Sequence, residues 1–297
     1  MIAFVILHYQ TIEHTIECIN SIRDTVGNDD YHIIVVDNAS PNNSGIELVN
    51  KYEIDEDVSV ILNEKNLGFS NGNNVGFKCA KYEYHADFIV MLNADTRILI
   101  SDFKTEVFDA FDKFSPGVIG PLILSGDSKY TSNPMRYNAL TIEKVDEFLK
   151  DYKIRLWCLK NGLLGSIVGV VYSFIFKVRS KIKRFFNEPH KGFSPTDYTR
   201  YQLNYTLHGS FMIFTPLYID KFDGLDEATF MYCEEDLLYQ RCQKSEIDIL
   251  YDPKIIIYHY EGGSTEVNRN SKAKRIFFFE NSIKSLRILR NRMEEIK

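Results

Sequence analysis

The chain has 297 residues, of which 44% are apolar, and a formal net charge of −6. This length suits one large domain, or one domain with an appendage, and the apolar content is sufficient for a substantial core. The negative charge disfavours general nucleic-acid binding, which requires a basic face, so we expect no nucleic-acid partner. The five cysteines have no CxxC or zinc-like spacing, which is typical of reduced thiols in a cytosolic protein.

Strands and helices alternate over residues 1–120. Hydrophobic patterning predicts strands at 2–7, 33–36, 58–62 and 88–92, and helices at 12–25, 71–82 and 101–114. A further helix is expected to begin at Ser44 with a capping box, because Glu47 lies three residues later. The alternation predicts an α/β fold in which helices cover both faces of a mostly parallel sheet. Right-handed crossovers then bring the strand C-termini to one edge.

The segment 137–204 breaks this alternation. Residues 156–176 carry one formal charge, Lys160, and a basic run follows at 177–184. On a helix, the apolar residues would share one face: Leu163, Leu164, Ile167, Val168, Val171, Phe174 and Ile175. A membrane span needs roughly 20 apolar residues, so we prefer an interfacial helix, with residues 155–186 contacting a membrane surface. A buried or dimerising helix, and then a true span, are the alternatives.

The α/β character returns in the last third of the chain. The sequence predicts a strand at 211–214, a helix after Glu234, a strand at 255–258 and a terminal helix from about residue 271. We therefore divide the chain into three parts: 1–136, a helical and partly basic insertion at 137–204, and 205–297.

Polar residues follow two of the predicted strands. Asp37 ends the second strand, where its carboxylate could accept hydrogen bonds from a base or a ribose, although the sequence around it is equally good turn chemistry. Asn93 and Asp95 directly follow the buried strand 88–92. That position lies at the sheet edge where α/β proteins bind ligands. Asp95 there would hold a divalent metal and, through it, a phosphate.

The segment 66–76 contains three glycines and four asparagines between a strand and a helix. Glycine lets a backbone approach a ligand closely, and a helix start offers free N–H groups to an anion. An ordinary helix start is the alternative interpretation.

Acidic and histidine residues mark the last third of the chain. Glu234, Glu235 and Asp236 open a helix, where acidic residues are favourable in any case, but a carboxylate there could also act as a general base. His259 follows an apolar strand and could give a nitrogen ligand to the metal held by Asp95. The loop after it offers N–H groups to a diphosphate.

Six segments, in this order, resemble the family 2 glycosyltransferases with the GT-A fold, especially the bacterial subgroup that builds capsule, O-antigen and cell-wall polysaccharides. They are residues 36–40, 66–76, 92–95, 209–211, 230–236 and His259. The resemblance implies a nucleotide-sugar-binding half at 1–136 and an acceptor-side half at 205–297.

The resemblance also implies roles for individual residues. Asp37 matches the acidic residue that contacts the nucleotide base, and Asn93 and Asp95 stand where the family has its DxD motif. His259 matches the histidine that completes the metal site. Further donor contacts are implied at His8, Asn66, Gly68 and Asn73, and contacts to the acceptor or diphosphate at Gly209, Ser210, Glu234, Ser264 and Arg269.

The register of the catalytic base has two solutions. Counting back from Arg241 puts the family's base at Glu235, whereas matching the literal Glu-Asp pair puts it at Asp236. We favour Asp236 slightly, because the shorter carboxylate is the family habit.

The implied reaction is inverting, Mn²⁺- or Mg²⁺-dependent transfer of a sugar from a UDP- or dTDP-sugar. The acceptor would be a saccharide or lipid-linked saccharide of cell-surface polysaccharide synthesis. The enzyme would be cytoplasmic, at the inner face of the membrane if the insertion binds lipid, and a homo-oligomer is a further option. The alternatives are a nucleotidyltransferase, which would want a glycine-rich basic loop where this chain has His8, and a non-catalytic carbohydrate-binding paralogue.

Overall fold

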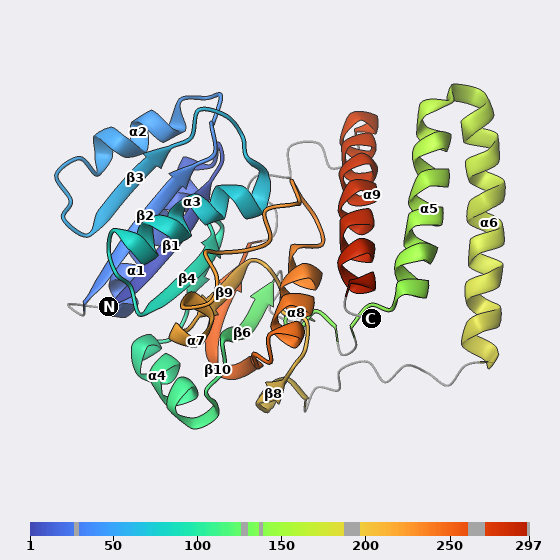
Figure 1. Cartoon of the computed structure of the whole chain (residues 1–297). Helices are drawn as coiled ribbons and strands as arrows, with labels where there is room; N and C mark the ends of the chain where they lie inside the picture. Colours follow the sequence, from blue (N-terminus) through green and yellow to red (C-terminus); the bar gives the residue numbers. More distant parts are fainter. Residues whose placement is uncertain (27–29, 126–129, 137–138, 187–196, 261–270, 296–297) are drawn as a thin grey trace.

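One large sheet forms the centre of the molecule (Figure 1). The computed structural model describes all residues except 27–29, 126–129, 137–138, 187–196, 261–270 and 296–297. Within the described residues the sheet has ten strands: β1 (Ile2–His8), β2 (Tyr31–Asp37), β3 (Val58–Leu62), β4 (Phe88–Asn93), β5 (Thr96–Ile98), β6 (Val118–Ser125), β7 (Tyr130–Thr131), β8 (Gln202–Leu203), β9 (Phe211–Phe214) and β10 (Ile249–His259).

The main path of the sheet runs β3-β2-β1-β4-β9-β6-β10-β5, with β7 beside β6 and β8 beside β10. Strands β3, β2, β1 and β4 are parallel, and β6 is parallel to β10. Strand β9 lies antiparallel between β4 and β6. The six strands β3, β2, β1, β4, β6 and β10 therefore point the same way, and the predicted mostly parallel α/β fold is confirmed.

Helices cover both faces of this sheet and form a further layer beside it. They are α1 (Ile12–Val26), α2 (Ser44–Lys51), α3 (Gly68–Tyr82), α4 (Phe103–Phe114), α5 (Ile142–Lys160), α6 (Gly162–Phe186), α7 (Pro216–Ile219), α8 (Glu234–Lys244) and α9 (Lys272–Glu294), with a 3₁₀ turn, η1, at Asp197–Thr199.

Alternating side chains of the strands build one core on each face. In β1, for example, Phe4 joins the core beneath α1 and α4, whereas Val5 joins the core beneath α3, α7 and α8. The five cysteines are free thiols, as the sequence predicts, and three of them, Cys18, Cys79 and Cys242, are buried.

The predicted capping box at Ser44 is wrong. Helix α2 is preceded by Asn43 in a left-handed conformation, and the N–H of Glu47 donates to the Asn43 carbonyl. The Ser44 hydroxyl instead lies 2.7 Å from Nε2 of His8 and donates to the side-chain oxygen of Asn42. Its role is therefore to join the start of α2 to the end of β1 through a buried histidine, which no local pattern indicates.

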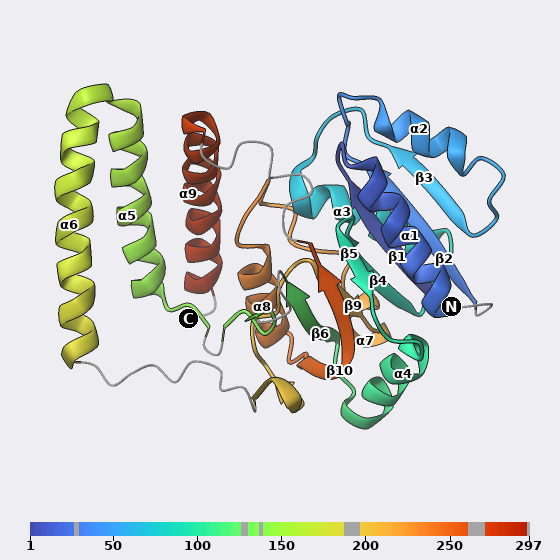
Figure 2. The ribbon, with the colours of Figure 1, turned by 180° about the vertical axis from the view of Figure 1, so that it is seen from behind.

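The insertion is a helical hairpin packed on the C-terminal helix. Helices α9, α5 and α6 lie side by side, with α6 outermost and farthest from the sheet (Figures 1 and 2). A small third core joins α5, α8 and α9 through Val145, Leu149, Leu237, Ile283, Leu286 and Leu289. The apolar stretch 156–176 is thus not one helix, because α5 ends at Lys160 and α6 begins at Gly162 with a φ of 53°. Among the described helices, none is long and apolar enough to cross a membrane.

One buried asparagine ties the two halves of the sheet domain together. The side-chain amide of Asn74, on α3, donates to the carbonyl of Leu225 at 2.9 Å and accepts from its N–H at 2.7 Å. Both residues are almost fully buried. Nearby Asn71 makes a single, more exposed hydrogen bond of 3.1 Å to the Glu227 carbonyl.

We expect Asn74→Ala to lower the free energy of unfolding by about 2 kcal/mol, because it leaves two buried backbone groups without partners. Asn71→Ala is the matched control and should cost less than about 1 kcal/mol. Urea unfolding followed by circular dichroism measures both, and equal losses in the two variants would contradict the role given to Asn74.

Candidate active site

The candidate site lies at the edge where β1, β2, β4 and β10 end and β9 begins. At this edge the N–H of Asn93 donates to the carbonyl of Ser210 at 2.9 Å, which joins the end of β4 to the segment before β9. The motif residues of both halves of the chain therefore meet along one line of the sheet, as expected for the carboxyl ends of parallel strands.

Asp37 is held in a tight turn at the end of β2. Its carboxylate accepts hydrogen bonds from the backbone N–H and the hydroxyl of Ser40. Gly45 faces it from α2, and a Cβ there would lie only 2.4 Å from the carboxyl carbon of Asp37. The structure therefore has the turn that the sequence around Asp37 favours. The Asp37 side chain is only 7% exposed.

His8 does not face a ligand space. It is fully buried at the end of β1, and its two ring nitrogens lie 2.7 Å from the hydroxyls of Thr15 and Ser44. Burial lowers the pKa of this imidazole, so the ring is neutral at pH 7. His8 therefore supports the Asp37 turn, and the expected donor contact from its side chain is not available in this structure.

The glycine- and asparagine-rich segment builds the junction between the halves. Gly68 has a φ of 82°, and a Cβ there would lie 2.0 Å from the carbonyl oxygen of Phe230. The neighbouring N–H of Phe69 donates to that same carbonyl. Asn66 accepts from the N–H of Gly68, and Asn73 donates to the Phe69 carbonyl, so both amides shape the backbone. Glycine is required here for the close backbone approach.

Asp95 and His259 meet as the sequence predicts. Asp95 follows β4 and His259 ends β10, and Nε2 of His259 lies 3.2 Å from Oδ1 of Asp95. The backbone adds a second link, because the N–H of Tyr260 donates to the Asp95 carbonyl. Both side chains are mostly buried, at 8% exposure for His259 and 13% for Asp95.

This pair is compatible with a divalent cation. Two ligands of an octahedral Mg²⁺ or Mn²⁺ at right angles lie about 3 Å apart, close to the 3.2 Å separation of the Asp95 and His259 atoms. Within the described part of the chain no three His, Cys, Asp or Glu side chains cluster in a way that could hold a metal. A cation here would therefore take its remaining ligands from phosphate oxygens and water.

His208 is a site residue that sequence reasoning missed. Its ring stands edge-on to that of His259, with the ring centroids 5.6 Å apart, and its Nδ1 lies 2.9 Å from the hydroxyl of Ser210. Its backbone N–H donates to the side chain of Asn133. Its position immediately before Gly209 and Ser210 is the one signal in the sequence that could have indicated it.

The acidic segment begins after two residues in left-handed conformations, Tyr232 (φ 75°) and Cys233 (φ 68°). Such backbone is strained in non-glycine residues and often occurs at functional sites. The turn is held from α9, because the hydroxyl of Ser285 donates to the carbonyl of Met231. The three carboxylates then leave the same helix start in different directions.

Glu235 is the partly exposed member of the three. Its Oε1 accepts a hydrogen bond of 3.3 Å from the N–H of Gly209. Since Ser210, next in the chain, bonds to Asn93, Glu235 belongs to the same line of contacts as the end of β4. This carboxylate is therefore connected, through Gly209 and Ser210, to the residue at the end of β4 that precedes Asp95 by two positions.

Asp236 is buried and forms a bidentate ion pair with Arg136. The guanidinium donates hydrogen bonds of 2.9 Å to Oδ1 and 3.0 Å to Oδ2. Burial raises the pKa of Asp236 to about 6, while Arg136 opposes this rise. Arg136 comes from the segment after β7, where it bridges to Thr206, and nothing local in the sequence links it to α8.

Glu234 is the most strongly perturbed of the three acids. Burial raises its pKa from 4.5 to about 8, and repulsion from Glu235 adds to the rise. Its Oε1 is buried and has no hydrogen-bond partner among the described residues. Ser264 and Arg269, expected to meet the diphosphate, lie outside the described residues.

The sequence matches the family described as Glycosyl transferase family 2 over residues 4–213. The match spans more than two thirds of the chain, so the protein belongs to this family and is a glycosyltransferase. The expected resemblance is thereby confirmed, and family membership disfavours the nucleotidyltransferase alternative. No curated protein sequence matches the chain.

Solved structures of Staphylococcus aureus TarS share the fold. TarS 1–349 in complex with UDP superposes with a TM-score of 0.52 at 14% identity, covering 94% of this chain and 64% of TarS 1–349. The complex with UDP-GlcNAc gives 0.53 at 13% identity, covering 95% and 66%. The longer TarS structure gives 0.52 at 15% identity, covering 95% and 43%. This chain thus spans about two thirds or less of these relatives.

We expect Glu234→Gln to flatten the pH dependence of stability. A folded-state pKa of about 8, above the ordinary 4.5, means that the folded protein binds the extra proton, so stability is lost as pH rises through this window. Between pH 5 and pH 9, the unfolding free energy of the wild type should therefore fall by about 2–4 kcal/mol more than that of the variant. Urea unfolding across that range measures it, with exposed Glu53→Gln as the control. A decline as steep as that of wild type would contradict the raised pKa.

Proposed function

We propose that this glycosyltransferase transfers a sugar with inversion from a UDP- or dTDP-sugar to a saccharide or lipid-linked saccharide of cell-surface polysaccharide synthesis, and that it requires Mn²⁺ or Mg²⁺. The observation that carries the proposal is the pair Asp95 and His259, linked through Asn93, Ser210 and Gly209 to the carboxylate of Glu235. A cation-binding pair and a base are thereby supported at one edge of the sheet.

The donor half is suited to a nucleoside diphosphate. The shielded Asp37 carboxylate lies at the end of β2 and is preorganised by Ser40 and Gly45, which favours a directional contact to a base or ribose. The UDP and UDP-GlcNAc complexes of TarS make uridine donors the first to test here.

The pair of Asp95 and His259 is suited to the diphosphate. Bound there, a divalent cation would stabilise the negative charge that develops on the departing nucleoside diphosphate. His259 is oriented for this role by burial in β10 and by the edge contact from His208. Asp95 is oriented by the backbone bond from Tyr260.

Glu235, rather than Asp236, is proposed as the general base. A base must reach the acceptor hydroxyl, accept its proton and release it later. Glu235 is partly exposed and lies beside Gly209, whereas Asp236 is buried and gripped by Arg136 at both oxygens. Asp236 then acts as a positioning residue, because its ion pair holds the first turn of α8 that carries Glu235.

Removing either member of the cation pair should weaken the effect of metal on nucleotide binding. In wild type, Mn²⁺ should strengthen UDP binding measured by calorimetry. In Asp95→Ala and His259→Ala we expect this strengthening to fall by at least about tenfold, because a cation ligand is lost. The control is Asp109→Ala, on the exposed side of α4. Unchanged Mn²⁺ dependence in both variants would overturn the metal assignment.

The two base candidates are separated by paired isosteric variants. Glu235→Gln should lower kcat by at least about 10²-fold with little change in the KM for donor, because general-base catalysis typically contributes that much. Asp236→Asn should reduce kcat less and should also lower thermal stability, because Arg136 loses its partner. Nucleotide release from a panel of UDP- and dTDP-sugars with saccharide acceptors measures kcat. The reverse ranking of the two variants would identify Asp236 as the base.

A further inference from the structure

The outer face of α6 is an unusually apolar exposed surface. Six side chains, each between 54% and 82% exposed, form a stripe along the helix: Leu163, Leu164, Ile167, Val170, Val171 and Phe174. Single exposed apolar residues are common on proteins, but a contiguous patch marks an interaction site. We call this patch the α6 stripe.

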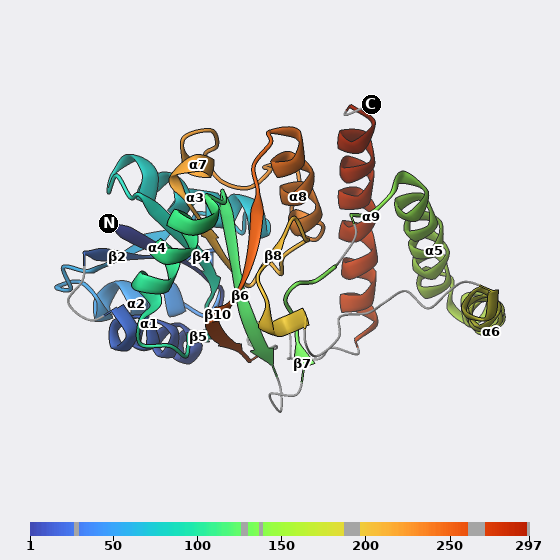
Figure 3. The same cartoon turned by 90° about the horizontal axis from the view of Figure 1, so that it is seen from below.

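Most of the α6 stripe faces away from the rest of the molecule, whereas Val170 and Phe174 also border a cavity of about 690 Å³ that residues of α5 and α9 line. The opposite side of the helix packs on α5, where Gly165 fits so closely that a Cβ would lie 2.0 Å from the carbonyl oxygen of Cys158. The hydroxyl of Tyr172 also donates to Asp151 on α5 at 3.0 Å. In Figure 3, α6 is seen end-on at the extremity of the molecule, with α5 and α9 between it and the sheet.

Taken together, α6 and the two helices behind it are strongly basic. Helix α6 has five basic and no acidic residues, α9 has seven basic and two acidic, and α5 has five basic and four acidic. Their net charge is therefore +11 in a chain whose total is −6, so the remainder carries −17. The positive charge is thus gathered in the layer that bears the α6 stripe.

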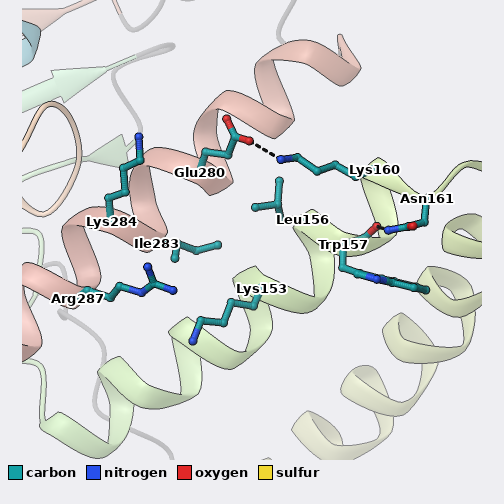
Figure 4. A pocket seen from close by; sticks show the side chains of 9 residues that line it. All are labelled: Lys153, Leu156, Trp157, Lys160, Asn161, Glu280, Ile283, Lys284 and Arg287. Carbon is teal, nitrogen blue, oxygen red and sulfur yellow. Dashed lines mark hydrogen bonds and ion pairs between the residues drawn. The ribbon is translucent and has the colours of Figure 1, made fainter.

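A groove between α5 and α9 shows this charge at close range. Figure 4 shows Lys153 and Lys160 of α5 with Lys284 and Arg287 of α9 along the groove, which has a volume of about 560 Å³. Glu280 is the one carboxylate among the residues that line it, and Lys160 pairs with it at 2.6 Å. The groove therefore keeps an excess of positive charge.

We propose that α6 docks the protein on an anionic phospholipid surface, with the α6 stripe among the lipid headgroups and the helix axis parallel to the membrane. An apolar face combined with basic residues is what such interfacial helices require. Positions 177, 181 and 184 follow the stripe at helical spacing, within the same helix. Basic residues near an anionic leaflet strengthen binding, and no described helix could instead span the bilayer.

A second copy of the chain fits this surface less well than a membrane. Pairing two α6 stripes would bring together two layers that each carry a net charge of +11, and such like-charge contact is unfavourable. An anionic lipid surface covers the apolar stripe and neutralises the charge at the same time. The inference goes beyond the proposed sugar transfer and does not depend on it.

The test is co-sedimentation of the full chain with vesicles. Wild type should pellet with vesicles of phosphatidylcholine and phosphatidylglycerol, and much less with phosphatidylcholine alone. The triple variant Leu163→Gln, Ile167→Gln and Phe174→Gln should reduce the partition coefficient at least about tenfold, because the apolar contact is lost.

The matched control removes three exposed apolar residues that lie outside α5, α6 and α9. Ile46→Gln, Ile54→Gln and Leu99→Gln replace side chains that are 53%, 91% and 53% exposed. Vesicle binding of this control should equal that of wild type. If the control and the α6 variant bind equally, the proposal is wrong.

A second variant tests the charge while keeping the stripe. Lys177→Gln, Lys181→Gln and Arg184→Gln should weaken binding to the anionic vesicles on the order of 10²-fold. Circular dichroism and thermal melting verify that each variant is folded. The proposal would be overturned if the wild type did not bind vesicles and sedimented without lipid as a dimer. If the α6 variant were then a monomer, the surface would be the contact between two copies of the chain.

Discussion

The antiparallel insertion of β9 between β4 and β6 is the constraint on which the site depends. Leu92 pairs with Phe211, and Ile119 with Ile213, so the residues before β9 lie at the edge where β4 and β10 end. A parallel strand in this place would deliver its preceding residues to the opposite edge. The reversed direction is what brings Gly209 and Ser210 next to Asn93, and through Gly209 anchors the acidic start of α8.

Much of the fold follows from local sequence because the hydrophobic pattern is strong. The strands β1 to β4 and β9, and most of the helices, coincide with the predicted segments to within a few residues. The sequence does not indicate β6, whose run contains Gly120 and Pro121. A Cβ at Gly120 would lie 2.5 Å from the side chain of Leu207, so this position needs a glycine because a segment distant in sequence packs against it. The hairpin break at Gly162 was hidden in the same way, inside an apolar run.

The candidate site divides along the same principle. Asp95 and His259 could be predicted because each follows a strand, and strand ends of a parallel sheet converge. Arg136 and His208 could not be predicted, because their roles depend on contacts with residues distant in sequence. Arg136 pairs with Asp236 about a hundred residues later, and His208 contacts His259 about fifty residues later. The choice between Glu235 and Asp236 is likewise not local. It depends on which of the two carboxylates forms the ion pair with Arg136, a residue distant in sequence.

The separation of charge also affects how a donor reaches the enzyme. The part of the chain outside α5, α6 and α9 carries −17, and a nucleoside diphosphate sugar is itself an anion. At long range the catalytic part therefore repels its own substrate, and encounter is slowed rather than steered. Added salt shortens the range of this repulsion to about a Debye length, roughly 8 Å at physiological ionic strength. Donor capture by this enzyme is thus expected to accelerate as ionic strength rises, the reverse of the behaviour of electrostatically steered enzymes.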